Sequence, residues 1–180
     1  MEVSNVKRLN WGCGTSAPPD WINSDIVPGP GVDVAANILD GLPIADESID
    51  YVTSQHALQD LQIYDQVAAL TELRRILKPG GVLRLALPDL DLAIDAYKRG
   101  DRDHFLVWDW ETLSGNFITH MLWYNCTRTP FTYEFAEELL RKAGFARVVR
   151  AAYRKTASPW PEIVELDSRE NESFFVEAFK

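Results

Sequence analysis

Residues 9–25 read LNWGCGTSAPPDWINSD. An apolar run ends there in Gly12 and Gly14, one residue apart, and a second apolar run ends in Asp25. Glycine permits backbone conformations that other residues avoid, and because it has no side chain a ligand can approach the main chain closely. A carboxylate offers two acceptor oxygens to neighbouring hydroxyl groups. The pattern indicates either an ordinary tight turn with a turn-forming aspartate, or a binding site shared by two strands.

Segments with strand and helix patterns alternate along the rest of the chain. Apolar residues recur every three or four positions over residues 64–77, which predicts an amphipathic helix. Further helices are expected over residues 90–99 and from Thr132 through Lys142. Strands are expected at residues 8–11, 21–27, 32–38, 48–54, 82–87, 145–153 and 173–179. This order favours a doubly wound α/β fold with a seven-stranded, mostly parallel sheet and an antiparallel last strand.

The connection between the first two expected strands contains Pro18 and Pro19, which prevent a regular helix there. We therefore expect the first helix of the fold to be shortened or lost. In doubly wound sheets, ligands bind at the carboxyl ends of the strands, near the point where strand order reverses. The Gly12–Gly14 turn lies at that position. Residues 100–130 show no clear periodicity, and we interpret them as an irregular insertion over the site.

Composition and charge limit the classes of partner. With 180 residues, 46% of them hydrophobic, the chain is expected to form one domain over residues 1–180. A net charge of -9 disfavours nucleic acid and anionic membranes as partners. Apolar runs fall short of the roughly 20 residues that cross a bilayer, and the N-terminus lacks the apolar core of a signal peptide, so a cytoplasmic location is expected. Cys13 and Cys126 have neither disulfide-framework nor metal-site spacing, and the oligomeric state stays open.

Five pieces of the chain, in order, resemble the class I S-adenosylmethionine-dependent methyltransferases, in particular the small bacterial branch related to the ubiquinone-type, methyltransferase-11-like domain. The resemblance implies a Rossmann-like sheet, S-adenosylmethionine as the cofactor and a methyl transfer reaction. The five pieces are LNWGCG (9–14), INSDI (22–26), AANILDGLPIADESIDYV (35–52), SQHALQDL (54–61) and LTELRRILKPGGVLRLALPD (70–89).

The resemblance also implies roles for residues at the strand ends. Asp25 matches the acidic residue that takes both ribose hydroxyls, and Asn37 the position that receives the adenine amino group, with Ile38 beside the ring. Gln55 and His56 match positions that contact the methionine end of the cofactor and sometimes the acceptor. The expected cofactor-binding residues are Asn10, Trp11, Gly12, Cys13, Gly14, Asp25, Asn37, Ile38, Gln55 and His56.

Three features depart from the family pattern. Asn10 stands where an acidic residue often faces the methionine amino group, which weakens the charge pairing there. Thr15 stands where a third glycine is common. Asn37 replaces the usual aspartate, although its carbonyl oxygen can still accept a hydrogen bond.

Histidine is the side chain best suited to remove a proton near neutral pH, and a base helps when the methyl acceptor is a hydroxyl. His120, in the sequence NFITHMLWYN, is our first choice for general base or acceptor-orienting residue, and His56 follows directly after the fourth expected strand. The alternative for His120 is a histidine packed within a helix. His104 is expected at the surface. Four aromatic residues of this region are expected to form either a wall of the acceptor pocket or part of the core; they are Trp108, Trp110, Trp123 and Tyr124.

The leading hypothesis is a methyltransferase that acts on a small molecule, by O-methyl transfer to a sugar or secondary-metabolite hydroxyl. The alternative is a non-catalytic cofactor-binding or scaffold protein with the same fold, motivated by Asn10, Gln59 and Asp60. A nicotinamide dehydrogenase is disfavoured, because it requires a fuller glycine motif followed directly by a long helix, which Pro18 and Pro19 prevent.

Overall fold

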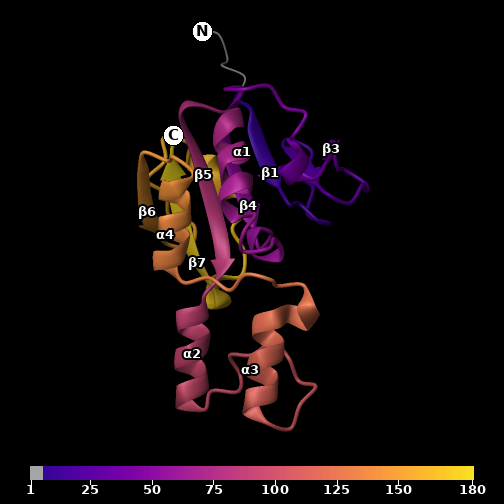
Figure 1. Ribbon diagram of the computed structural model, residues 1–180, viewed down its shortest axis with the longest axis vertical. Coiled ribbons are helices and arrows are strands. Elements are labelled where there is room, and N and C mark those ends of the chain that lie inside the picture. The colour runs from indigo at the N-terminus through magenta and orange to yellow at the C-terminus, as the bar shows by residue number, and fades with distance from the viewer. Residues whose placement is uncertain (1–5) are drawn as a thin grey trace.

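The computed structural model describes residues 6–180, and the seven strands in this range form one sheet in the order β3-β2-β1-β4-β5-β7-β6 (Figure 1). Pairings among β1 to β5 are parallel, whereas β7 is antiparallel to both β5 and β6. The predicted sheet and its antiparallel last strand are therefore confirmed. The strands are β1 (Arg8–Trp11), β2 (Ile22–Asp25), β3 (Val34–Ala35), β4 (Ile49–Gln55), β5 (Leu77–Pro88), β6 (Arg147–Ala151) and β7 (Ser173–Phe179).

The predicted helices are also present, with slightly narrower bounds in the case of the first. Asp89 caps the second helix by accepting a hydrogen bond from the Leu92 amide (3.2 Å), and Thr132 caps the fourth by accepting one from the Phe135 amide (3.2 Å). The α-helices are α1 (Gln66–Ile76), α2 (Leu90–Arg99), α3 (Leu113–Leu122) and α4 (Tyr133–Lys142). Short 3-10 helices are η1 (Ile38–Asp40), η2 (Leu58–Asp60), η3 (Trp123–Asn125), η4 (Pro161–Val164) and η5 (Glu170–Glu172).

Helices α1 and α4 cover one face of the sheet (Figure 1). Alternate residues of the strands point toward them, since side chains along a strand alternate between faces. Burying one such aliphatic side chain contributes on the order of 2 kcal/mol to folding. Fully buried members of this core are Leu9, Val52, Leu73, Leu83 and Leu140.

Residues 152–172, which we call the β6–β7 segment, cover the opposite face. A second apolar cluster lies beneath it, formed by Trp21, Tyr51, Val82 and Ile163. Both faces of the sheet are thus covered, as a doubly wound sheet requires, but on this face the cover is a segment with only short 3-10 helices rather than long α-helices.

The loop between β1 and β2 replaces the first helix of the fold. Within the described residues no helix joins these strands, so the expected shortening is complete. Buried side-chain amides hold the loop instead: Asn10 Nδ2 donates to the Ser16 carbonyl (2.8 Å), and Asn23 Nδ2 donates to the Pro18 carbonyl (2.9 Å). The loop path is therefore fixed by hydrogen bonds from the strands.

Some expected boundaries were wrong. The third strand is two residues long because η1 begins at Ile38, and β5 begins at Leu77 rather than at residue 82. Leu77 already pairs with Ile49, and pairing resumes at Val82 after a register shift. The connection of residues 78–81 therefore bulges out within the strand instead of preceding it.

The expectation that residues 100–130 are irregular was also wrong, because this range contains α3 and η3. Phe117 and Met121 of α3 pack against Ala96 and Phe105, so α2 and α3 lie side by side beyond the carboxyl end of β5 (Figure 1). The helical periodicity is obscured because apolar Ile118, on the same helix, is exposed.

Two further observations concern the ends and surface of the chain. No helix of the described residues combines the length and apolar character needed to cross a membrane. Residues 1–5, part of the N-terminus that we expect to lack a signal peptide, lie outside the described residues. The single-domain organisation over residues 1–180 stays a prediction.

Candidate active site

A cavity of about 590 Å³ opens at the carboxyl ends of the central strands. Its volume is within the range of roughly 300–1,000 Å³ that small-molecule and cofactor sites occupy. The structure brings all of the predicted cofactor-binding residues together around this cavity, from Asn10 in β1 to His56 after β4. Their role in binding stays a prediction, but their convergence places them in one site.

The glycine turn forms the floor of this cavity at the end of β1. Gly12 and Gly14 adopt positive φ angles of 69° and 53°. A Cβ atom on Gly12 would lie 2.2 Å from the Cβ of Ala57, so only glycine fits there. A Cβ on Gly14 would meet no described atom within 4 Å, so the main chain at Gly14 borders open space. An approaching ligand can therefore reach the backbone at this turn.

Asp25, at the end of β2, both shapes the turn and lines the cavity. Its Oδ2 accepts a hydrogen bond from the Gly14 amide (2.8 Å), and its Oδ1 accepts one from the Val27 amide (3.0 Å). The two interpretations of Asp25, turn former and ligand carboxylate, are compatible. Each carboxylate oxygen keeps further acceptor capacity for a hydroxyl group on the cavity side.

Two asparagines expected at the cofactor site have structural hydrogen bonds. Asn37 Oδ1 accepts from the Leu39 amide (3.1 Å) and so caps η1, which leaves part of its acceptor capacity for a ligand. Asn10 is buried, and its amide nitrogen donates to the Ser16 carbonyl and to Asn23 Oδ1 (3.2 Å). Asn10 thus holds the loop that frames the cavity.

A second cavity, of about 260 Å³, adjoins the first. The two cavities share His56, Asp60 and Arg169, so these three side chains lie at the boundary between them. His120 and Trp123 line the second cavity from the α3 side. The site therefore consists of a larger cavity at the strand ends and a smaller, adjacent one lined in part by α3.

Both predicted histidines face the second cavity in neutral form. Burial lowers the pKa of His56 to about 3, with the nearby charges of Arg169 and His120 adding to the effect, and its Nε2 shares a hydrogen bond with Ser173 Oγ (2.7 Å). Burial also lowers the pKa of His120, against the opposing effect of Glu172. His120 Nδ1 is buried without a hydrogen-bond partner in the described part of the chain.

Other expectations for the region around α3 need correction. Trp108, Trp110 and Tyr124 line neither cavity and are exposed, so they form neither the pocket wall nor the core. Trp123 alone of this aromatic set contributes to the second cavity. The ring of His104, expected at the surface, is partly buried, with its centroid 5.7 Å from that of His120.

The sequence interpretation missed the contribution of the β6–β7 segment. Leu166, Ser168 and Arg169 line the first cavity, and Glu172 lines the second. No motif marks these residues. The one usable signal was the length of the connection between the last two strands. Two adjacent antiparallel strands ordinarily need a connection of only about 2–5 residues, and this one spans residues 152–172.

The chain matches the model of the methyltransferase domain family over residues 24–85. It is 44% identical over 57 residues to a probable methyltransferase, ltbC, of Aspergillus luteorubrus, an alignment that covers 31% of this chain and 20% of the relative. The chain thus spans about a fifth of the length of the curated relatives it matches.

Solved structures show the same fold at low sequence identity. A Thermotoga maritima methyltransferase, a possible histamine N-methyltransferase, superposes with a TM-score of 0.60 at 22% identity, covering 97% of this chain and 82% of that one. Phosphoethanolamine N-methyltransferase 2 of Haemonchus contortus, in complex with S-adenosylmethionine, gives 0.59 at 14% identity, covering 97% and 48%.

The comparisons show that the chain has the fold of S-adenosylmethionine-dependent methyltransferases, and that residues 24–85 match the methyltransferase domain family. Both findings agree with the resemblance to the class I methyltransferases, a class whose cofactor is S-adenosylmethionine.

Proposed function

We propose that this protein transfers a methyl group from S-adenosylmethionine to a hydroxyl group of a small molecule, with a sugar or secondary-metabolite hydroxyl as the acceptor class. The observation that carries the proposal is the pair of adjacent cavities. The larger has bare main chain and a carboxylate, Asp25, and the smaller has two neutral histidines, His56 and His120.

The residues of the larger cavity fit the cofactor. Asp25 would accept hydrogen bonds from ribose hydroxyls, and the turn at Gly14 leaves room for the ligand against the backbone. Asn37 and Ile38 would contact the adenine. When bound, S-adenosylmethionine supplies an electrophilic methyl group on its sulfonium.

The residues of the smaller cavity fit the acceptor. Methyl transfer is a direct displacement, so holding the acceptor hydroxyl in line with the methyl group supplies much of the catalysis. His120 would take the hydroxyl proton, because its side chain lines this cavity and burial lowers its pKa, which keeps the ring neutral. His56, fixed by Ser173, would orient the acceptor at the junction of the cavities.

The remaining expectations form part of the same proposal. The net charge of -9 supports a partner that is neither nucleic acid nor an anionic membrane, and the site is formed by cavities rather than by a basic groove. We place the protein in the cytoplasm, acting as one domain without a metal ion, and assign no oligomeric state.

The proposal is tested in two steps. Calorimetric titration with S-adenosylmethionine and S-adenosylhomocysteine should show binding of both, and incubation with a panel of hydroxylated metabolites should yield a product that has gained one methyl group by mass spectrometry. Failure to bind either cofactor form would overturn the proposal. Binding without methylation of any amine or hydroxyl acceptor would favour the alternative, a non-catalytic cofactor-binding protein.

A further inference from the structure

The β6–β7 segment places one charged side chain between the two cavities. Arg169 lines both, and within residues 6–180 it is the only lysine or arginine around the larger one, where Asp25 and Asp60 are the acidic residues. The amino-acid end of S-adenosylmethionine carries a carboxylate. Because a carboxylate and a guanidinium form bidentate, charge-assisted hydrogen bonds, Arg169 is the side chain of this cavity best suited to that group.

The position of Arg169 in the sheet order agrees with this match. Asn37 follows β3 and Asp25 ends β2, so the adenosine-binding positions lie toward one edge of the sheet. Arg169 lies beyond the end of β4, on the other side of the glycine turn, because the amide of adjacent Ser168 donates to Gln55 Oε1 (3.3 Å). A cofactor with its ribose at Asp25 would extend its amino-acid end toward Arg169.

The guanidinium of Arg169 retains free bonding capacity. Its Nη1 pairs with Glu172 Oε1 at 2.9 Å, and 45% of its side chain is exposed. An arginine has five N–H donors, so the ion pair with Glu172, which lines the smaller cavity, leaves N–H groups of Arg169 available for a ligand. Glu172 therefore orients the side chain without saturating it.

A buried ion cluster fixes the backbone just before Arg169. Arg84, in β5, is fully buried and donates through Nε and Nη2 to both oxygens of Asp167 (2.7 and 2.5 Å) and through Nη1 to Glu177 (2.7 Å). Its remaining N–H groups reach the carbonyls of Ala152 and Lys155 at the start of the segment. The hydrogen bonds of Arg84 thus hold the β6–β7 segment against the sheet both near its start, at Ala152 and Lys155, and near its end, at Asp167.

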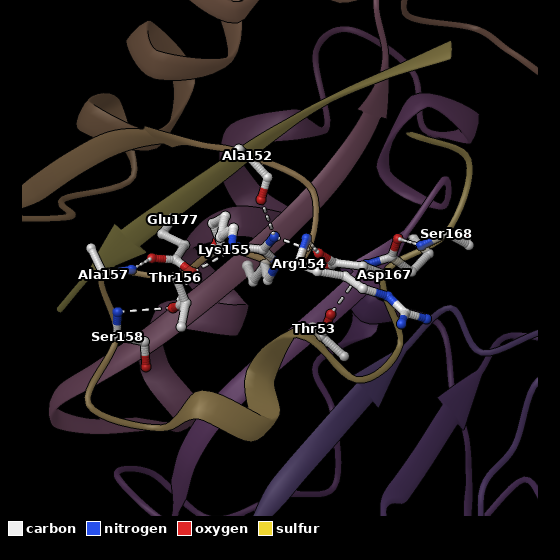
Figure 2. Close-up of polar contacts among 12 residues, drawn as sticks. Thr53, Ala152, Arg154, Lys155, Thr156, Ala157, Ser158, Asp167, Ser168 and Glu177 are labelled. Atoms are coloured by element: carbon white, nitrogen blue, oxygen red, sulfur yellow. Dashed lines mark hydrogen bonds and ion pairs between the residues drawn. The ribbon is translucent and has the colours of Figure 1, made fainter. Parts of the chain in front are cut away.

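The carboxylates of this cluster are also satisfied by the segment itself (Figure 2). Asp167 Oδ2 accepts from the Arg154 amide (2.8 Å), and Glu177 Oε2 accepts from the Ala157 amide (2.8 Å). Because both charges are buried and bonded on several sides, the backbone at Asp167 has little freedom. Arg169, two residues further on, is held at the cavity junction as a result.

We propose that Arg169 binds the methionine carboxylate of S-adenosylmethionine, and that Arg84, through Asp167, is the positioning residue that holds Arg169 there. This inference rests on the proposed function. It adds a binding residue from outside the matched segment of residues 24–85.

The test compares S-adenosylhomocysteine with methylthioadenosine, which has the same adenosine and thioether but no carboxylate. Arg169→Gln should weaken S-adenosylhomocysteine binding on the order of 10- to 100-fold in calorimetry and leave methylthioadenosine binding unchanged. Arg169→Lys should recover part of the loss. The matched control is Arg154→Gln, which removes the same charge from an exposed position of the same segment and should change neither affinity.

The outcomes separate this inference from the proposed function. If the wild-type protein binds neither ligand, the proposed function fails and the inference fails with it. If the wild-type protein binds both, and Arg169→Gln weakens both equally, weakens neither, or raises only the KM of an acceptor, the inference alone is overturned.

The positioning role has a readout of its own. Asp167→Asn keeps the shape of the side chain and removes its charge, so it should lower the ratio of S-adenosylhomocysteine to methylthioadenosine affinity in the same direction as Arg169→Gln. A folded variant, verified by thermal unfolding, with an unchanged ratio would remove Arg84 and Asp167 from the positioning role.

Discussion

Asp25 contributes both to the fold and to the candidate binding site, because its carboxylate accepts hydrogen bonds that hold the glycine turn against β2 and also lines the larger cavity. Asp25→Ala should weaken cofactor binding by about 1–3 kcal/mol, the usual loss for a charge-assisted hydrogen bond. Calorimetric titration with S-adenosylmethionine measures the loss. Because both oxygens of Asp25 also accept backbone amides of the turn, thermal unfolding of Asp25→Ala is measured alongside to detect a loss of the turn itself. Unchanged affinity in Asp25→Ala would exclude this side chain from the binding site.

His120 carries the clearest catalytic prediction. His120→Ala should reduce turnover roughly 100-fold or more while cofactor affinity stays nearly intact, because its ring lines the smaller cavity and not the larger one. Single-turnover kinetics and calorimetry on the same preparation separate the two effects. An unaffected rate would assign His120 to packing alone.

His56 should make the stability of the protein depend on pH. A histidine with a lower pKa in the folded chain binds fewer protons there than in the unfolded chain, so protonation favours unfolding. Its contribution to stability is intact above about pH 6.5 and is lost as the pH falls toward about 3. Urea unfolding across this range should show stability decreasing with acidity. The decrease should be shallower in His56→Gln, and an identical profile in that variant would contradict the prediction.

The glycine turn makes a prediction at the scale of one structural element, with a matched pair of variants. Gly12→Ala should destabilise the protein by about 1–3 kcal/mol or more, because its new Cβ would clash with Ala57 at a positive φ. Gly14→Ala has the same kind of φ but no clash, so it should fold better and mainly weaken cofactor binding. Thermal unfolding and calorimetry distinguish these effects, and equal destabilisation would contradict the description of the turn.

Elements with local signals were predictable from the sequence. The periodicity of α1, the cap at Thr132 and the strand over residues 173–179 each depend on neighbours in the chain, and the structure confirms them. The candidate site residues up to His56 were predicted because the segments that carry them resemble those of the methyltransferase family.

Elements defined by distant contacts were not predictable in this way. Arg84 and Asp167 are 83 positions apart, and no local pattern marks Asp167 or Arg169 as partners of the sheet. Helix α3 was missed because one of its faces packs on α2 while apolar Ile118 remains exposed, which removes the usual amphipathic pattern.

At the scale of the whole molecule, the ion cluster under the β6–β7 segment should make folding sensitive to the loss of a single charge. Arg84→Met would leave Asp167 and Glu177 buried without their cation, which should cost about 3–5 kcal/mol. Combining it with Asp167→Asn and Glu177→Gln removes the uncompensated charge and should restore a large part of the loss. Urea unfolding measures both variants, and a mild effect of Arg84→Met alone would contradict the prediction.

Residues 89–131 leave and re-enter the sheet region at one point, where Asp89 pairs with Phe131 and the Leu90 amide donates to the Phe131 carbonyl (2.9 Å). This excursion supplies His120, Trp123, Cys126 and Thr127 to the smaller cavity and none of the residues around the larger one. Under the proposed function, exchange of this one contiguous segment should therefore alter acceptor preference while cofactor binding stays unchanged.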